Sequence, residues 1–335
     1  MAPYHPSPRL SHGTYMTLLK IISTGPVEPI AVDILQPLAE VVVTSNPSQE
    51  ALTLLLEDAV GIILRGEGFL TAPVIEAAPE LKVIARSGVG YNNVAVEAAT
   101  ARKIPVVFTP GAGARAVAEA SMAWILAFAK RVLYWDQQFK QGNWRSRFET
   151  RGSDLEGATL GIIGFGRIGQ DLARLATPFD MQIVAYDPFV PDETAEKLGV
   201  TMLDLDELLS RSDFVCLHAA STEENRGLIN RTRLKNIKRG AYLINLARGE
   251  LIENLDILQE ALEDGQLAGV GLDVFAPEPA EPHPIFEHPD CLTAPHALAA
   301  TQGSLDKIFH SMATDMAAIL RGEKPRFVVN PEVLD

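Results

Sequence analysis

The most constraining feature of the sequence is the run Gly164-Phe165-Gly166-Arg167-Ile168-Gly169, between an apolar segment at 160–163 and an amphipathic segment at 167–175. Glycines at this spacing predict a tight turn from a buried strand into a helix. Gly164 permits the turn, Gly166 lets the backbone approach a pyrophosphate, and Gly169 lets the helix pack on the strand. The free N–H groups at the helix start favour an anion. The run therefore predicts a βαβ unit that binds a dinucleotide.

A carboxylate follows the next predicted strand, since Asp187 comes directly after the apolar segment 182–186. Such a carboxylate accepts hydrogen bonds from the adenosine ribose hydroxyls and repels a 2′-phosphate. Positions 188–191 hold no Lys or Arg that would bind that phosphate. The pattern predicts NAD rather than NADP as the cofactor, and the alternative interpretation is a turn residue that precedes Pro188.

Short runs rich in Val and Ile alternate with amphipathic segments along the whole chain, which is typical of βα units with buried parallel strands. A first series of strands is expected at 19–22, 41–43, 61–64, 82–85 and 105–108, and a second at 160–163, 182–186, 214–217, 242–245, 268–272 and 291–293. The fold class predicted is α/β, with two Rossmann-like doubly wound parallel-sheet domains.

A long buried helix is expected at 116–133, where apolar residues recur every three or four positions. The arm that follows, up to Gly157, interleaves aromatic residues with Gln, Lys and Arg. Its aromatic residues are Trp135, Phe139, Trp144 and Phe148. Such an arm is either a surface loop or part of a subunit contact, because aromatic residues and Arg are enriched at interfaces. The last helix is expected at 304–320, and the tail 321–335 is expected to return to the first domain.

Length and charge limit the function classes. The 335 residues are enough for about two domains, and the net charge of −14 disfavours nucleic acid and membrane surfaces as partners. Cys216 and Cys291 form no C-x-x-C motif, so a reducing, cytoplasmic location is expected. Residues 1–16 lack the pattern of a signal peptide and are expected to form a flexible leader.

Three groups suited to hydride chemistry on a 2-oxo acid follow strands of the second series. Arg248 can hold a carboxylate with two hydrogen bonds, and the alternative is a capping or surface arginine. His296 can protonate a developing alkoxide. Glu278 can pair with His296, and an adjacent carboxylate would raise the imidazole pKa.

The loop 277–289 and its flank also contain residues with metal-ligand chemistry, namely Glu281, His283, Glu287, His288 and Asp290. Proline breaks the segment and the residues have no helical spacing. A solvated loop is the favoured interpretation, and no metal is expected.

With these residues, the sequence resembles the D-isomer-specific 2-hydroxyacid dehydrogenases, and within them the phosphoglycerate dehydrogenase-like branch. The matching runs are 85–94 (ARSGVGYNNV), 117–119 (VAE), 160–169 (LGIIGFGRIG), 245–252 (NLARGELI), 271–275 (GLDVF) with Glu278-Pro279, 293–296 (TAPH) and 329–333 (VNPEV). The resemblance covers nearly the whole chain from about Leu18. It implies an NAD-dependent oxidoreductase that interconverts a D-2-hydroxy acid and its 2-oxo acid.

The resemblance also implies roles for individual residues. Arg248 would anchor the substrate carboxylate, and His296 would be the general acid/base with Glu278 as its partner. Further substrate contacts would come from Arg65, Arg86, Ser87, Gly88 and Val89. Cofactor contacts would come from Gly164, Gly166, Arg167, Ile168, Gly169, Asp187, His218, Ala219, Asn225, Ala247 and Asp273.

A domain organisation follows from the same resemblance. The substrate domain would comprise 17–115 and 305–335, and the NAD-binding domain 116–304, with the active site in the cleft between them. The helix and arm at 116–157 would make a homodimer.

The substrate stays open between a general D-2-hydroxy acid and D-3-phosphoglycerate. Arg65, Arg86 and Arg115 can bind a second anionic group. However, Gly113 stands where the phosphoglycerate branch has an asparagine. Val89, Ala120, Ala220 and Asn225 are further departures from that branch.

A function from another class is a non-catalytic NAD-binding scaffold, because fold and motif do not dictate function. The presence of Arg248, Glu278 and His296 favours the enzyme, since a scaffold has no chemical need for them.

Overall fold

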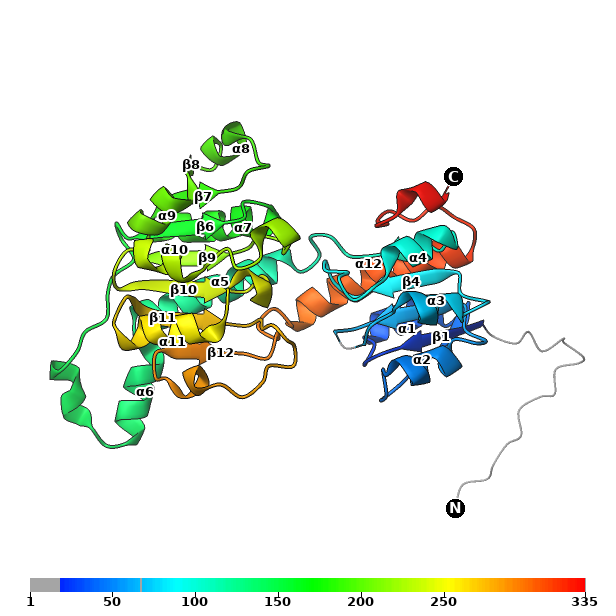
Figure 1. Ribbon diagram of the computed structural model, residues 1–335, viewed down its shortest axis with the longest axis horizontal. Helices are drawn as coiled ribbons and strands as arrows, with labels where there is room; N and C mark the ends of the chain where they lie inside the picture. Colours follow the sequence, from blue (N-terminus) through cyan, green and yellow to red (C-terminus); the bar gives the residue numbers. More distant parts are fainter. Residues whose placement is uncertain (1–18, 67, 335) are drawn as a thin grey trace, which may run out of the picture. The chain divides into compact units, whose positions relative to one another are not determined.

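The computed structural model describes residues 19–66 and 68–334 (Figure 1). The predicted leader at 1–16 lies outside these residues. The chain divides into two compact units. Unit 1 comprises Met1–Pro110 and Asp306–Asp335, and unit 2 comprises Gly111–Leu305.

Unit 1 contains a five-stranded parallel sheet with the strand order β2-β1-β3-β4-β5. Its strands are β1 (Leu19–Ser23), β2 (Ala39–Val43), β3 (Gly61–Leu64), β4 (Val83–Arg86) and β5 (Val106–Val107). Its first helices are α1 (Pro29–Leu35), α2 (Gln49–Leu55), α3 (Ala72–Glu76) and α4 (Val96–Ala101). This order is one of the two common orders of doubly wound sheets, and the strands confirm the first predicted series.

The end of the chain packs on unit 1. Helix α12 (Gln302–Leu320) leads to a tail that ends in the 3₁₀ helix η6 (Pro331–Leu334). Val328 forms an antiparallel bridge with Val107. The buried Asn330 side chain accepts a hydrogen bond from the Val106 N–H at 2.8 Å. The tail thus adds polar contacts to the edge strand β5.

Unit 2 contains a seven-stranded parallel sheet with the order β12-β11-β10-β9-β6-β7-β8. Its strands are β6 (Thr159–Ile163), β7 (Gln182–Tyr186), β8 (Thr201–Met202), β9 (Phe214–Leu217), β10 (Ala241–Asn245), β11 (Leu267–Leu272) and β12 (Cys291–Thr293). Its helices are α5 (Ala114–Ala129), α6 (Val132–Lys140), α7 (Arg167–Ala176), α8 (Asp192–Glu196), α9 (Leu205–Arg211), α10 (Arg231–Asn236) and α11 (Leu255–Glu263), with 3₁₀ turns η1 (Trp144–Phe148), η2 (Thr177–Phe179), η3 (Glu223–Asn225), η4 (Gly249–Leu251) and η5 (Pro284–Glu287).

In this order β6 lies between β7 and β9, and the sheet is built outward from β6 in two directions. Ligands of such sheets bind at the carboxyl ends of the strands at this point, which here are β6 and β9. Alternate strand residues face two separate cores. Ile163 packs with α9, α10 and α11 on one face, and Ile162 packs with α5 and α7 on the other. The prediction of two doubly wound parallel α/β sheets is confirmed.

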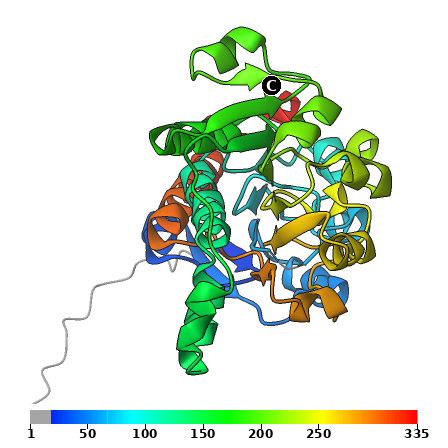
Figure 2. The same ribbon diagram turned by 90° about the vertical axis from the view of Figure 1, so that its left-hand side faces the viewer.

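Two details of the prediction are wrong. The helix expected at 116–133 is divided into α5 and α6, because Arg131 adopts a left-handed conformation with φ of 50°. The beginning of the arm is therefore helical, and both views show α6 extending beyond the sheet of unit 2 (Figures 1 and 2). The sheet of unit 2 has a seventh strand, β8, which two residues are too short to reveal in a sequence pattern.

Among the helices of residues 19–66 and 68–334, none is both long enough and apolar enough for a membrane span.

Candidate active site

Most of the residues predicted for cofactor binding and catalysis follow the carboxyl ends of strands in unit 2. Gly164 follows β6, Asp187 follows β7, and His218 and Ala219 follow β9. Ala247 and Arg248 follow β10, Asp273 follows β11, and His296 comes three residues after β12. Because all these strands are parallel, their carboxyl ends meet at one edge of the sheet.

The glycine-rich turn between β6 and α7 has the shape that an anion requires. Gly164 has φ of +94°, and a Cβ there would lie 2.4 Å from the Ala219 backbone nitrogen. A Cβ on Gly169 would lie 2.4 Å from the carbonyl oxygen of Gly164, so only glycine fits at this position too. By contrast, a Cβ on Gly166 would meet no atom within 4 Å. The turn thus has an open surface at the start of α7, where helix N–H groups attract phosphate oxygens.

Asp187 is fixed beside this turn by backbone donors. Its Oδ2 accepts the Phe165 N–H at 2.8 Å and its Oδ1 accepts the Phe189 N–H at 2.9 Å. Each carboxylate oxygen has a second lone pair. The side chain can therefore still accept hydrogen bonds from hydroxyl groups of a ligand.

His218 is held by a residue that the sequence analysis missed. The Ser121 hydroxyl on α5 donates to the Val117 carbonyl at 2.9 Å, so its oxygen accepts from His218 Nε2 at 3.3 Å. Burial lowers the pKa of His218 to about 4, so the ring is neutral at pH 7. Its Nδ1 is then an acceptor that is buried and has no hydrogen-bond partner in the described part of the chain. That atom can accept a hydrogen bond from a ligand at this edge.

These features fit a bound dinucleotide. The open glycine turn can receive a pyrophosphate, Asp187 can receive ribose hydroxyls, and His218 Nδ1 offers an unused acceptor. Asn225 is the exception among the predicted cofactor residues. Its amide is used within η3, where it accepts from the Thr222 N–H and donates to the Ala220 carbonyl, both at 2.7 Å.

Arg248 is positioned by a second residue to which the sequence analysis gave no role. Asn245 is fully buried at the end of β10. Its amide donates to the Arg248 carbonyl at 2.8 Å and accepts from the Ala247 N–H at 3.0 Å. The Arg248 backbone is thereby fixed, and its half-buried guanidinium donates through Nη1 to the Ala247 carbonyl at 2.6 Å. The sequence signal for this role was an asparagine as the last residue of an otherwise apolar strand.

His296 and Glu278 form the predicted pair. His296 Nδ1 lies 2.9 Å from Glu278 Oε2, and Glu278 Oε1 accepts the Phe275 N–H at 3.0 Å. Burial raises the pKa of Glu278, but hydrogen bonds from His296 and Phe275 outweigh it and hold the pKa below its usual value. Glu278 is therefore ionised near neutrality, and it orients the imidazole with Nε2 free of this contact.

Asp273 fixes the loop that carries His296. The buried Asp273 carboxylate accepts the Ala297 and Leu298 N–H groups at 2.9 and 3.3 Å. Burial raises the pKa of Asp273. His296 itself has a left-handed backbone with φ of 53°, which is uncommon outside glycine and occurs at functional sites. Two carboxylates, Asp273 and Glu278, thus determine where the imidazole lies.

The predicted substrate residues lie at the carboxyl edge of the sheet in unit 1. Arg65 follows β3, Arg86 ends β4, and Leu64 pairs with Arg86 in the sheet. The Ser87 hydroxyl donates to the Leu64 carbonyl at 3.2 Å. Gly88 and Val89 continue the same loop, and Val89 is exposed.

The histidines of the proline-rich loop have local partners. His283 Nε2 lies 3.2 Å from Asp256 Oδ1, and His288 Nδ1 accepts the Asp290 N–H. Within residues 19–66 and 68–334, no group of three or more His, Cys, Asp or Glu side chains is arranged to hold a metal ion.

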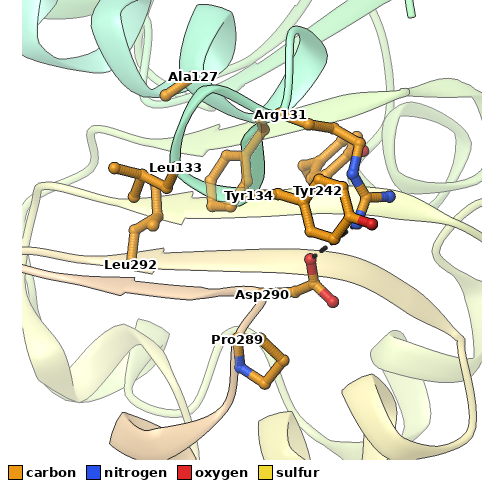
Figure 3. A pocket seen from close by; sticks show the side chains of 9 residues that line it. Ala127, Arg131, Leu133, Tyr134, Tyr242, Pro289, Asp290 and Leu292 are labelled. Atoms are coloured by element: carbon orange, nitrogen blue, oxygen red, sulfur yellow. Dashed lines mark ion pairs between the residues drawn. The ribbon is translucent and has the colours of Figure 1, made fainter. Parts of the chain in front are cut away.

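A small cavity lies near the amino ends of β10 and β12, away from the predicted site (Figure 3). Arg131 Nη2 lies 3.8 Å from Asp290 Oδ1, and its guanidinium lies 4.7 Å from the Tyr134 ring centre. The contact with Asp290 attaches the junction of α5 and α6 to the residue that precedes β12, and the contact with Tyr134 lies within the helical segment. The cavity contains no residue predicted for cofactor or substrate.

Known proteins share both the sequence pattern and the fold of this chain. Residues 122–297 match the model of the D-isomer specific 2-hydroxyacid dehydrogenase, NAD binding domain. The chain is 39% identical over 315 residues to D-3-phosphoglycerate dehydrogenase of Methanocaldococcus jannaschii, across 93% of this chain and 60% of that protein. It is 37% identical to glyoxylate reductase of Korarchaeum cryptofilum, across 86% of this chain and 88% of that protein.

Among solved structures, the TT0316 protein from Thermus thermophilus superposes with a TM-score of 0.86 at 36% identity. The match covers 93% of this chain and 100% of that one. The chain thus spans about three fifths of the phosphoglycerate dehydrogenase relative but the full length of the Thermus protein.

Proposed function

The chain belongs to the D-isomer specific 2-hydroxyacid dehydrogenase family and contains its NAD-binding domain, and from this premise we propose that it interconverts a D-2-hydroxy acid and its 2-oxo acid. The observation that carries the proposal is the contact of 2.9 Å between His296 and Glu278. In this proposal the acid/base group is the His296 imidazole, which follows β12 at the same sheet edge as the glycine-rich turn. When bound, NAD supplies or accepts the hydride.

Arg248 anchors the substrate carboxylate in this proposal. A guanidinium can hold a carboxylate with two parallel hydrogen bonds, which fixes its position as well as its charge. Asn245 supports that role because it fixes the backbone of Arg248. Substrate residues in unit 1, namely Arg65, Arg86, Ser87, Gly88 and Val89, contribute further binding.

His296 is the general acid/base. Its Nδ1–H donates to Glu278, so the opposite nitrogen, Nε2, can exchange a proton with the substrate oxygen. The ionised Glu278 stabilises the protonated imidazole that delivers the proton during reduction. Asp273 and Glu278 reduce the freedom of the loop, and a fixed acid is in place before the substrate arrives.

His296→Ala tests the proposal. We expect kcat for reduction of 2-oxo acids to fall by about 100- to 10,000-fold, because the variant lacks the proposed proton donor. NADH affinity, measured by fluorescence titration, is expected to stay within about twofold. His310→Ala, which removes an exposed histidine of α12, is the matched control. Full activity of His296→Ala would overturn the assignment.

A second candidate is D-3-phosphoglycerate dehydrogenase activity specifically, favoured by the 39% identity to the Methanocaldococcus protein. Reduction of 3-phosphohydroxypyruvate in preference to unphosphorylated 2-oxo acids would support it. If no 2-oxo acid is reduced although NADH binds, the non-catalytic NAD-binding scaffold becomes the better interpretation.

We further propose that the protein is a homodimer in the cytoplasm. Helix α6 and η1 expose Phe139, Trp144 and Phe148, which are 68%, 61% and 74% accessible. Exposed aromatic residues of this kind are typical of protein contacts. The buried cysteines Cys216 and Cys291 are free thiols, which agrees with a reducing compartment.

A further inference from the structure

An aromatic side chain of unit 2 is left in water beside the glycine-rich turn. Phe189 follows β7 and is 91% exposed, more than any other large apolar side chain of residues 19–66 and 68–334. Neither hydrophobic core of unit 2 contains it, although Tyr186 and Val190 on either side pack against these cores. The chain is thus anchored on both sides of Phe189, while its ring adds nothing to the packing of unit 2.

The backbone of Phe189 is fixed relative to the cofactor turn by Asp187. The Phe189 N–H donates to Asp187 Oδ1 at 2.9 Å, which is the hydrogen bond of an Asx turn. The other oxygen, Oδ2, accepts the N–H of Phe165 at 2.8 Å, and Phe165 belongs to the glycine-rich turn. One carboxylate therefore holds two turns together, at the ends of the neighbouring strands β6 and β7.

The order of these groups matches the order of groups in the adenosine half of NAD. The glycine-rich turn suits the pyrophosphate, and Asp187 suits the hydroxyls of the adenosine ribose. Adenine is bonded directly to that ribose. The residues that follow Asp187 are therefore the ones that the base meets when the ribose is on this carboxylate.

The chemistry of this segment suits a neutral flat ring. Positions 188–191 are Pro, Phe, Val and Pro, so the segment carries no charged side chain. An exposed aromatic ring can stack on a nucleobase, because every base has a π-face and both partners lose apolar surface to water. Phe189 offers such a ring at a position that its own backbone hydrogen bond fixes in advance.

We infer that Phe189 stacks on the adenine ring of NAD and is a binding residue for that half of the cofactor. The inference goes beyond the proposed function. It depends on the NAD-binding domain and on the geometry around Asp187, and it does not depend on the hydride chemistry or on the identity of the substrate.

The test is the dissociation constant of NADH, measured by fluorescence titration of the whole protein. For Phe189→Ala we expect it to rise at least about fivefold, which is the lower end of the loss when one aromatic partner of a base is removed. Phe189→Trp keeps a ring that can stack and is expected to stay within about twofold of the wild type. Phe179→Ala is the matched control, since Phe179 is also exposed but precedes β7 and lies at the opposite end of that strand.

A second ligand assigns the loss to the adenine half. ADP-ribose contains the adenine, both riboses and the pyrophosphate but no nicotinamide, and its binding is measured by isothermal titration calorimetry. We expect Phe189→Ala to weaken ADP-ribose by the same factor as NADH, because the lost contact is to the base that the two ligands share.

Three results would overturn the inference. The first is wild-type NADH affinity in a Phe189→Ala protein whose melting temperature shows it to be folded. The second is a loss of affinity that Phe189→Trp does not restore, and the third is a loss for NADH without one for ADP-ribose. None of these binding results would affect the proposed function, which fails instead if NADH binds and no 2-oxo acid is reduced.

Discussion

His218 shows how a single buried side chain makes this protein sensitive to pH. Its Nε2 faces the Ser121 hydroxyl, and its Nδ1 is buried. Burial lowers the pKa from 6.5 to about 4. The unfolded chain therefore takes up a proton at a higher pH than the folded one, and stability falls as the pH decreases between these two values.

We expect His218→Gln to lose that part of the pH dependence. The lowered pKa makes roughly 3 kcal/mol of the free energy of unfolding depend on a neutral His218; this part is present above about pH 6.5 and is lost as the pH falls towards about 4. The measurement is the free energy of unfolding by urea at pH 7.5 and 5.0 without NAD. His310→Gln, at an exposed site, serves as the control. Identical pH dependence in His218→Gln and the wild type would contradict the expectation.

At the level of elements, α5 packs on β11 through two aromatic residues, which fill the space beside two glycines of the strand. A Cβ on Gly271 would lie 2.5 Å from a ring carbon of Trp124, and one on Gly269 would lie 2.8 Å from a ring carbon of Phe128. Both aromatic residues are buried. The strand run Ala-Gly-Val-Gly-Leu is therefore a docking surface for a helix, and its glycines are determined by that contact.

Gly271→Ala should destabilise unit 2 by about 1–3 kcal/mol, because Trp124 must move in a packed core. Gly303→Ala is the matched control. A Cβ at Gly303 in α12 meets no atom within 4 Å, and alanine favours helix, so a small gain in stability is expected there. Thermal unfolding of both variants checks the pair. A Gly271→Ala protein as stable as the wild type would show that α5 adjusts without cost.

For the whole molecule, the arm formed by α6 and η1 is notable because the fold of one chain gives no role to its exposed aromatic residues. Its aromatic residues contribute little to the core of unit 2, since Phe139, Trp144 and Phe148 are exposed. Covering them with a second copy of the chain would remove apolar surface from water. This is the physical reason for the proposed homodimer.

Replacing Phe139 and Trp144 together by Ser should shift the protein from dimer to monomer. The mass is measured by light scattering after gel filtration across a range of concentrations. Phe189→Ser is the control, because Phe189 is 91% exposed but lies outside the arm. A double variant that keeps a dimeric mass would exclude the arm as the contact, and a monomeric wild type would exclude the dimer.

Much of the fold was predictable because its signals are local. Buried parallel strands are continuous apolar runs, so the strands of both sheets were expected close to their observed positions, apart from the two-residue strand β8. The division of the long helix at Arg131 was not predictable. Apolar periodicity continues through that position. The left-handed backbone accompanies contacts of Arg131 with Tyr134 and with Asp290, and Asp290 is far from Arg131 in the sequence.

The two parallel sheets, the glycine-rich turn and the partners His296 and Glu278 could be predicted from the sequence, because strand ends in a parallel sheet meet at one edge. The side chains that hold those groups are visible only once the chain is folded. Asn245 supports Arg248, Ser121 contacts His218, and Glu28 pairs with Arg65. Each of these contacts depends on distances of a few ångströms between elements, and no pattern along the chain encodes such a distance.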